Sequence, residues 1–344
     1  MRALELTQYR RMTVREVETP KPARGELLLR VRAVGICGSD IHGYDGSTGR
    51  RVPPIVMGHE AAGEVVEVGD DCTIGLSVGD RVTFDSTLSC GNCYYCRRSQ
   101  INLCVNRRVF GVSCDEYKQD GAFSEYVVVP ERVVYPLPEQ VSFEEGAMIE
   151  PLSIAVHSVN LIPRNIGDSV LVVGAGLIGL LTVQVLRNAG FGRIFVSDVV
   201  ESRLQKASEI GADHVFNAKT TDISAAVSEA TDGLGAACSI DAVGAAETAE
   251  TAIRSVRRDG LVVLVGNVSP SISVPLQYIV NRQIALKGSC ASSGEYPACL
   301  ELVQRGEVDL QTIMSEKISL DDAPQWFERL YKGDPDTLKV IINP

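Results

Sequence analysis

Positive charge is scarce in this sequence, and no cluster of lysine or arginine residues occurs in it. The 33 Lys and Arg residues are outnumbered by 44 Asp and Glu residues, so the formal net charge is −11. This balance argues against binding to nucleic acid or to an anionic membrane surface.

Long apolar runs are absent as well. No apolar run reaches the roughly 20 residues that a membrane-spanning helix needs. The N-terminal segment MRALELTQYRRMTVREVETP contains no apolar core of the signal-peptide kind. We therefore expect a cytoplasmic protein whose thiols stay reduced. The chain also lacks repeats, and its 344 residues suffice for two domains.

Four of the ten cysteines lie in the short segment SCGNCYYCRRSQINLC, as Cys90, Cys93, Cys96 and Cys104. In a reducing compartment, clustered cysteines hold metal more often than they form disulfides. Four thiolates saturate a tetrahedral Zn²⁺ and leave no position for water or substrate, so we expect a structural zinc site. Four unliganded thiols are the alternative, and in either case the chemistry must lie elsewhere.

The sequence pattern changes at about Ile154. Before it, short alternating segments such as GELLLRVRAVG and AAGEVVEVG predict an all-β, barrel-like domain, interrupted by ICGSDIHGYDG and the cysteine-rich segment as long loops. After it, apolar strands alternate with helices, among them LIGLLTVQVLRNAG and AAETAETAIRSVRR. This alternation predicts an α/β domain with a parallel sheet covered on both faces. We place this domain at residues 154–290 and the barrel-like domain at 1–153 and 291–344.

The segment VLVVGAGLIG contains Gly174, Gly176 and Gly179 in the G-x-G-x-x-G spacing, after a predicted strand and at the start of a predicted helix. This context is typical of a dinucleotide-binding turn. Asp198 ends the next strand, where a carboxylate accepts hydrogen bonds from a ribose and repels a 2′-phosphate. NAD is therefore favoured over NADP, although the nearby Arg203 could meet a phosphate.

Three further segments contain candidate metal ligands. VGICGSDIHGYDG includes Cys37, VMGHEAAGEV includes His59 and Glu60, and AMIEPLSIAVHS includes Glu150. None is specific alone, because single cysteines and histidines are more often packed core residues. Together they suggest a metal site with one position left open for water or substrate, as catalytic zinc requires.

The order of these motifs resembles the zinc-dependent medium-chain dehydrogenase/reductase superfamily, and within it the polyol (sorbitol-type) and threonine dehydrogenase branch. The similarity runs almost end to end through GICGSDIH, GHEAAGEV, the cysteine-rich segment, IEPLSIAVH, VLVVGAGLIG and the closing LKVII. It implies a GroES-like β-barrel catalytic domain, a Rossmann domain, and an active site in the cleft between them.

The resemblance also implies roles for individual residues. It assigns the catalytic zinc ligands to Cys37, His59 and Glu60, with Glu150 as a further ligand or one water away, and the sequence leaves that choice open. Asp40 is implied to accept the other ring N–H of His59 and so to orient it.

Proton transfer and cofactor binding are assigned in the same way. Ser39 is implied to contact the substrate oxygen and His42 to act as the outer base of a proton relay, with an ordinary surface histidine as the alternative. The residues implied to contact the cofactor are Gly174, Gly176, Leu177, Ile178, Gly179, Asp198, Arg203, Val243, Gly266, Asn267, Ser289 and Cys290.

By this resemblance the protein is an enzyme that oxidises a secondary alcohol to a ketone, with one catalytic and one structural Zn²⁺ per chain and NAD as hydride acceptor. Sorbitol dehydrogenases carry an Arg-Tyr pair after a Lys-Gly dipeptide, and Ala291 and Ser292 stand there instead. Another polyol, a sugar acid, a short diol or an aminoalcohol such as threonine is therefore open as substrate. Arg50 and Arg51 either neutralise an acidic substrate group or lie in a solvated loop.

Several alternatives accompany this prediction. L-threonine 3-dehydrogenase is the alternative within the branch. A zinc-independent quinone or enone reductase would lack the metal ligands, and a non-catalytic zinc- and nucleotide-binding protein would need no open metal position. The family is usually dimeric or tetrameric, so we expect a homo-oligomer, most simply a homotetramer, that protects the edge strand near Gln283–Ser289.

Overall fold

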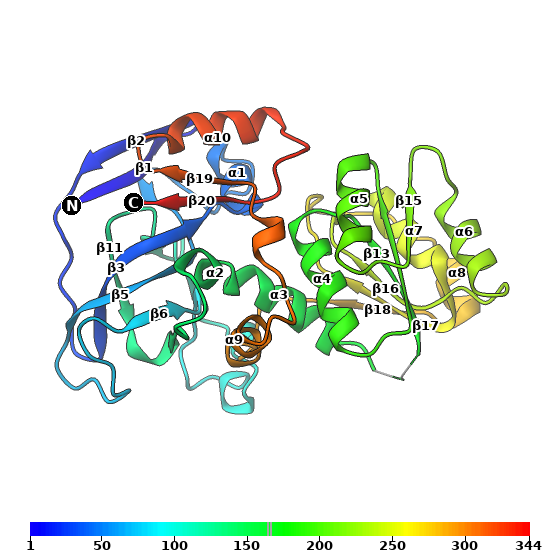
Figure 1. The fold of residues 1–344 in the computed structure, drawn as a ribbon, viewed down its shortest axis with the longest axis horizontal. Coiled ribbons are helices and arrows are strands. Elements are labelled where there is room, and N and C mark those ends of the chain that lie inside the picture. Colours follow the sequence, from blue (N-terminus) through cyan, green and yellow to red (C-terminus); the bar gives the residue numbers. More distant parts are fainter. Residues whose placement is uncertain (164, 166) are drawn as a thin grey trace. The chain divides into compact units, whose positions relative to one another are not determined.

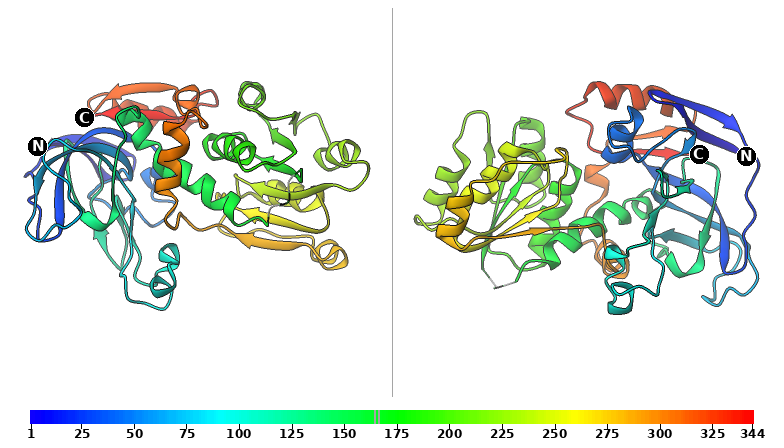
Figure 2. Two further views of the ribbon diagram at one scale, coloured as in Figure 1. Left: turned by 60° about the horizontal axis from the view of Figure 1, so that its bottom comes forward. Right: turned by 180° about the vertical axis from the view of Figure 1, so that it is seen from behind.

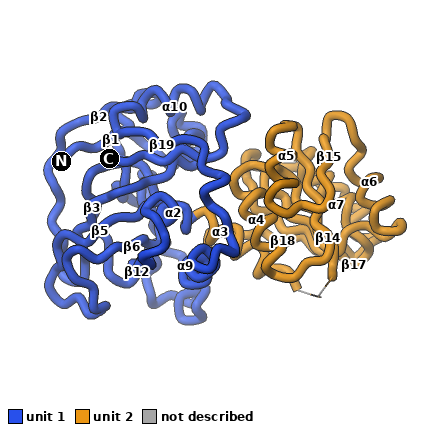
Figure 3. Tube along the Cα trace, in the orientation of Figure 1, with its two compact units in different colours: residues 1–150, 293–344 blue, residues 151–292 orange. Residues whose placement is uncertain are grey.

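The computed structural model describes residues 1–163, 165 and 167–344. The chain divides into two compact units, which Figure 3 shows in different colours. Unit 1 comprises residues 1–150 and 293–344, and unit 2 comprises residues 151–292. The boundary at residue 150 falls within helix α3 (Ile149–Asn160). Among the described residues, no helix combines the length and apolar character that crossing a membrane requires.

Unit 1 contains a seven-stranded sheet in the order β12-β6-β5-β3-β20-β19, with β11 paired to β3. The last strand of the chain, β20, pairs antiparallel with β3 and parallel with β19, so it lies inside the sheet (Figure 1). In sheet order the strands span Val134–Pro136, Arg81–Phe84, Glu60–Val68, Glu26–Gly35, Val340–Asn343 and Glu316–Ser319, with β11 at Tyr126–Pro130.

Shorter elements complete unit 1. A second sheet, β2-β1-β4, packs its apolar residues into the same core, where the rings of Phe123 and Phe327 meet edge-on. The remaining strands are β1 (Arg2–Gln8), β2 (Arg11–Glu16), β4 (Ile55–Val56), β7 (Thr87–Leu88), β8 (Arg108–Val109), β9 (Val112–Ser113) and β10 (Lys118–Gln119). The helices are α1 (Gly38–Tyr44), α2 (Phe143–Ala147), α9 (Tyr296–Gln304) and α10 (Ala323–Lys332).

Unit 2 is a six-stranded parallel sheet in the order β15-β14-β13-β16-β17-β18. This is the strand order of a doubly wound dinucleotide-binding fold, with helices on both faces (Figure 2). In chain order the strands are β13 (Ser169–Val173), β14 (Arg193–Asp198), β15 (His214–Asn217), β16 (Ala236–Asp241), β17 (Val256–Leu264) and β18 (Ala285–Gly288). The helices are α4 (Leu177–Asn188), α5 (Glu201–Glu209), α6 (Ile223–Ala230), α7 (Ala246–Ser255) and α8 (Leu276–Arg282).

The structure corrects two local predictions. The segment after Cys37 is not a loop, because α1 forms there with Cys37 as its N-cap. The helix expected over AAETAETAIRSVRR ends at Ser255, and β17 begins at Val256. Val256 is buried and pairs with Ala236 in the parallel sheet, so tertiary packing decides against the helical pattern.

Candidate active site

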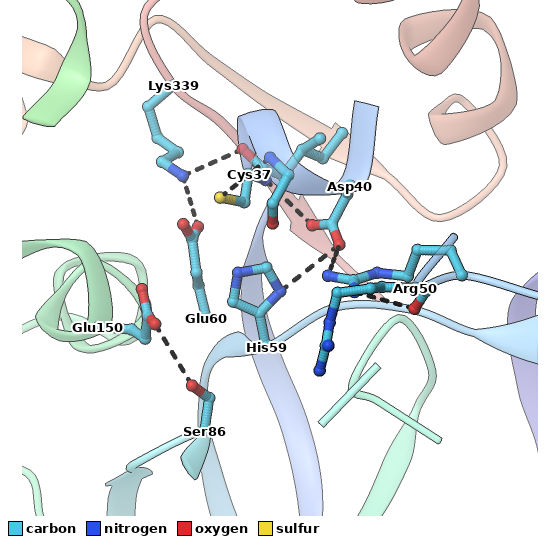
Figure 4. Close-up of polar contacts among 11 residues, drawn as sticks. Cys37, Asp40, Arg50, His59, Glu60, Ser86, Glu150 and Lys339 are labelled. Atoms are coloured by element: carbon cyan, nitrogen blue, oxygen red, sulfur yellow. Dashed lines mark hydrogen bonds and ion pairs between the residues drawn. The ribbon is translucent and has the colours of Figure 1, made fainter. Parts of the chain in front are cut away.

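The candidate metal ligands converge in unit 1 near the carboxyl end of β3. Cys37 lies two residues after the end of β3 and caps α1, and its Sγ accepts a hydrogen bond from the Ser39 N–H at 3.4 Å. His59 precedes β5 and Glu60 begins it, opposite Gly35 of β3. One ligand atom from each of Cys37, His59 and Glu60 lies within 4.8 Å of the other two (Figure 4).

This cluster fits a metal ion. The Oε1 atom of Glu60 is buried, and no described residue donates a hydrogen bond to it. A buried acceptor of this kind is costly unless it is satisfied. A thiolate, an imidazole and a carboxylate are suitable ligands for zinc, and three protein ligands leave a fourth position open.

Asp40, which the resemblance assigns to orienting His59, lies beside this cluster. Its Oδ2 accepts the Cys37 N–H at 3.2 Å, and its Oδ1 lies 3.5 Å from Nδ1 of His59. Nδ1 is buried and makes no hydrogen bond to any described residue, so Asp40 is the nearest recorded acceptor that faces it. Burial alone would raise the pKa of Asp40, but the charges of His59 and Arg51 outweigh it and lower the pKa to about 2. Asp40 is therefore a carboxylate at neutral pH.

Lys339 is a residue of this site that the sequence did not single out. Its Nζ is buried and donates hydrogen bonds to Oε2 of Glu60 and, at 3.0 Å, to the carbonyl of Ile36. A Cβ at Gly35 would lie 2.1 Å from Oε2 of Glu60, so glycine makes room for this pair. One oxygen of Glu60 is thus held by Lys339, and the other is left for a metal.

Glu150 lies in the first turn of α3 and does not join the cluster of ligand atoms described above. Its Oε1 is 3.3 Å from the Ser86 hydroxyl, which donates to it (Figure 4). Burial raises the pKa of Glu150 to about 7; the charge of His59 opposes this rise, and that of Glu60 adds to it. The predicted proton-transfer residues Ser39 and His42 are both exposed on α1.

The four clustered cysteines also converge. Cys90, Cys93, Cys96 and Cys104 each offer a sulfur within 4.8 Å of the others, in a segment with two short 3₁₀ helices, Cys96–Arg98 and Ile101–Leu103. The Sγ of Cys104 accepts the Cys90 N–H at 3.3 Å. The four sulfurs are therefore close enough to one another to share one ion, as a saturated zinc site requires.

The glycine motif forms the expected turn between β13 and α4 in unit 2. Gly174 has a φ of 96°, and a Cβ at Gly179 would lie 1.8 Å from the Gly174 carbonyl oxygen. Gly176 is the N-cap, so the N–H groups of Leu177 and Ile178 open the helix, where intrahelical acceptors are lacking. Such N–H groups are suited to a pyrophosphate.

Asp198 has partners that the sequence did not reveal. Its Oδ2 accepts the Ala175 N–H at 2.6 Å, and its Oδ1 accepts the N–H groups of Val199 and Val200 at 2.7 and 2.9 Å. The carboxylate therefore ties the glycine turn to the end of β14. Oδ2 keeps one lone pair that a ribose hydroxyl could use.

The other predicted cofactor residues also follow strand ends. Val243 comes after β16, Gly266 and Asn267 after β17, and Ser289 and Cys290 after β18. Arg203 lies in α5. Because the sheet is parallel, these carboxyl ends share one edge, which is where doubly wound folds bind nucleotides.

Comparison with known proteins decides the family. Residues 23–139 match the alcohol dehydrogenase GroES-like domain, and residues 178–305 match the zinc-binding dehydrogenase domain. The sorbitol dehydrogenase of Halalkalibacterium halodurans is 33% identical over 351 residues, covering 100% of this chain and 99% of that protein. The chain belongs to the zinc-dependent medium-chain dehydrogenase family. It is an oxidoreductase of the alcohol dehydrogenase type, with the expected GroES-like and Rossmann domains.

Two further relatives are similar to this dehydrogenase over almost its whole length. The L-threonine 3-dehydrogenase of Pyrococcus abyssi is 35% identical over 334 residues, covering 95% of this chain and 93% of that protein. A zinc-binding dehydrogenase from Sinorhizobium meliloti, solved bound to NADP, is 31% identical with a TM-score of 0.91, covering 100% of this chain and 99% of that one. The polyol and threonine branch of the family is thus confirmed.

The two neighbouring arginines, Arg50 and Arg51, lie in different environments. Arg50 is exposed and its Nη2 donates to the Tyr117 hydroxyl at 3.4 Å. Arg51 is only 5% exposed and pairs with Asp40, so a solvated loop is the wrong description of Arg51.

Asp85 is a buried acid that the sequence analysis did not single out. Asp85 accepts the Thr87 N–H at 2.8 Å through Oδ1, while its Oδ2 is buried with no partner among the described residues. Burial raises the pKa of Asp85 to about 6. No sequence motif signals Asp85 or Lys339, because each acquires its environment from residues distant in the chain.

Proposed function

We propose that this dehydrogenase oxidises a secondary alcohol of a polyol, sugar acid, small diol or aminoalcohol to a ketone, and that NAD is its hydride acceptor. The observation that carries the proposal is the convergence of Cys37, His59 and Glu60, with one carboxylate oxygen still unpartnered. A non-catalytic binding protein would not need three ligands arranged around an open position.

The chain's own residues would hold and orient the reacting groups. Cys37, His59 and Glu60 would bind a catalytic zinc, and the four clustered cysteines a structural one. When bound, the catalytic zinc supplies Lewis acidity toward the substrate hydroxyl, and the nicotinamide supplies the hydride acceptor. Ser39 would take the hydroxyl proton and relay it toward the cofactor ribose and His42; both residues are exposed on α1. Glu150, with its carboxylate bonded to Ser86, would serve as a second proton acceptor or as an exchangeable ligand.

The preference for NAD rests on Asp198. Its carboxylate lies at the end of β14, and its partners hold it against the glycine turn. Negative charge there would repel a 2′-phosphate. The NADP-bound relative shows that the family includes NADP-binding proteins, so the cofactor preference of this chain is a direct question for kinetics.

A substrate panel tests the proposal. Polyols, sugar acids, butanediol and threonine are each incubated with NAD⁺ or NADP⁺ while NADH or NADPH absorbance is recorded, and zinc per chain is counted. We expect two zinc ions, and turnover with NAD⁺ that is lost in Cys37→Ala and His59→Ala. The control variant Cys72→Ala, outside both cysteine sites, should retain activity. No reduced cofactor with any alcohol would favour the non-catalytic alternative.

L-threonine is the second candidate substrate, favoured by the 35% identity to a threonine dehydrogenase over 95% of this chain. The same substrate panel distinguishes a threonine dehydrogenase from a dehydrogenase of polyols, sugar acids or diols. If L-threonine is the substrate, it should give the highest kcat/KM of the panel.

We also propose that the dehydrogenase is a cytoplasmic homo-oligomer. The edge strand β18 and the preceding α8 expose Leu276, Val280 and Leu286, which an edge-to-edge contact between two sheets would cover. Light scattering coupled to gel filtration measures the number of subunits, and a monomer would reject this arrangement.

A further inference from the structure

Arg51 is a buried cation next to the candidate zinc site. Its guanidinium donates through Nη2 to Oδ1 of Asp40 at 3.3 Å and through Nη1 to the carbonyl of Arg50 at 3.2 Å. Its Nε is buried without a partner among the described residues. A charge is rarely held in this way on a protein surface loop, because burying it is costly unless it is paired.

The surrounding chain is shaped to place this side chain. A Cβ at Gly43 of α1 would lie 2.1 Å from Cγ and 2.9 Å from Cβ of Arg51, so only glycine leaves room for its stem. The backbone around Arg51 is fixed from the other side by Ser113, whose N–H donates to Arg50 at 3.1 Å and whose carbonyl accepts from Val52 at 3.0 Å. The guanidinium position is thus set by two elements.

Asp40 joins Arg51 to two metal ligands. The carboxylate accepts from the Cys37 backbone and faces Nδ1 of His59, while Arg51 bonds the same Oδ1 that faces His59. Without a cation at this place, the fully buried Asp40 would have only the imidazole as a charged partner. A histidine that binds zinc is neutral, so apart from the zinc ion itself Asp40 would then be a buried carboxylate with no positive charge beside it.

We propose that Arg51 is a positioning residue of the catalytic zinc site. Its permanent charge holds Asp40 in place as the acceptor for Nδ1–H of His59, so that His59 presents its Nε2 to the metal. This inference rests on the proposed zinc site and extends it one layer outward, to a residue that touches neither metal nor substrate. Outer partners of this kind change metal affinity by about 10- to 100-fold when they are removed.

The test compares Arg51→Met, which removes the charge, with Arg51→Lys, which keeps it. Because the contact to Asp40 uses a single nitrogen, a lysine ammonium can replace it. For each variant we would measure zinc content, the rate of catalytic zinc loss to a chelator, and the visible absorption bands of Co²⁺ substituted at that site. The matched control is Arg24→Met, which removes an exposed arginine paired with Asp71.

We expect Arg51→Met to lose catalytic zinc about tenfold faster or more, and to shift the Co²⁺ bands. Arg51→Lys should recover most of both effects, and Arg24→Met should match the unmodified enzyme. If Arg51→Met is less stable to urea but keeps the zinc-loss rate and the Co²⁺ spectrum, Arg51 is only part of the scaffold and the proposal is wrong.

A second variant and the zinc content of the protein separate failure to fold and failure of the zinc site from failure of this inference. Should Arg51→Met fail to fold, Gly43→Ala displaces the arginine without removing it, and the same faster zinc loss is expected; an unchanged rate would overturn the proposal. Should Cys37→Ala hold as much zinc as the unmodified protein, the catalytic site itself is rejected and this inference with it. If the unmodified protein binds two zinc ions and Arg51→Met keeps its zinc-loss rate and Co²⁺ spectrum, only this inference is rejected.

Discussion

The ion pair between Lys339 and Glu60 gives the sharpest stability prediction. Both side chains are at most 1% exposed. Among the described residues, the only other acceptor for the Lys339 ammonium is the Ile36 carbonyl. Removing one partner of a buried pair leaves an uncompensated charge and costs about 3–5 kcal/mol. We therefore expect Lys339→Met to lower the free energy of unfolding of the zinc-free protein by about that amount.

The double variant Lys339→Met/Glu60→Gln isolates the cause. Glutamine fills the same volume without charge, so the double variant should be more stable than Lys339→Met by at least about 2 kcal/mol in urea unfolding. Zinc bound at Glu60 should also shrink the loss, because the metal replaces the missing positive charge. The control Lys317→Met, which breaks the half-exposed pair with Glu144, should cost no more than about 1 kcal/mol. Equal losses in the single and double variants would refute the reasoning.

Three further predictions concern other sites. Burial raises the pKa of Asp85 from the ordinary 3.8 to about 6, so ionisation of Asp85 destabilises the folded state as the pH rises from about 4 to 6. Asp85→Asn should therefore raise the free energy of unfolding at pH 8 by up to about 3 kcal/mol, and this gain should vanish near pH 4. An equal gain at both pH values would contradict this reasoning. Cys93→Ser should lower the zinc content by one ion per chain while Cys72→Ala leaves it at two, and a Cys93→Ser protein that still holds two would reject the structural site. Asp198→Asn should reduce the preference for NAD⁺ over NADP⁺ in kcat/KM by tenfold or more, and an unchanged ratio would remove Asp198 from cofactor selection.

Local sequence patterns predicted most of the fold. The alternation of apolar strands with helices predicts the six parallel strands of unit 2, and the glycine spacing predicts the turn at Gly174, because both depend on neighbouring residues. The α1 helix was missed because its seven residues show no helical periodicity, and its cap is a cysteine rather than a usual capping residue. The end of α7 was misplaced because burial of Val256 in the sheet outweighs the local pattern.

Site residues whose role depends on long-range contacts could not be predicted from the sequence. The candidate ligand residues could be named from their motifs and the family resemblance, but Lys339 reaches Glu60 across 279 positions in the chain. Arg51 lies in a loop whose composition suggests solvent, and only Gly43 and Asp40 show that it is buried. Residues of this kind carry no periodicity or spacing, because their role depends on what the fold brings beside them.

The position of β20 has a consequence for how unit 1 folds. Lys339, which pairs with Glu60, directly precedes β20, the strand that lies between β3 and β19. The segment that completes this sheet therefore also supplies the positive charge beside Glu60, 279 positions earlier in the chain. A chain truncated before Lys339 would leave β3 and β19 without the strand between them and Glu60 without its cation.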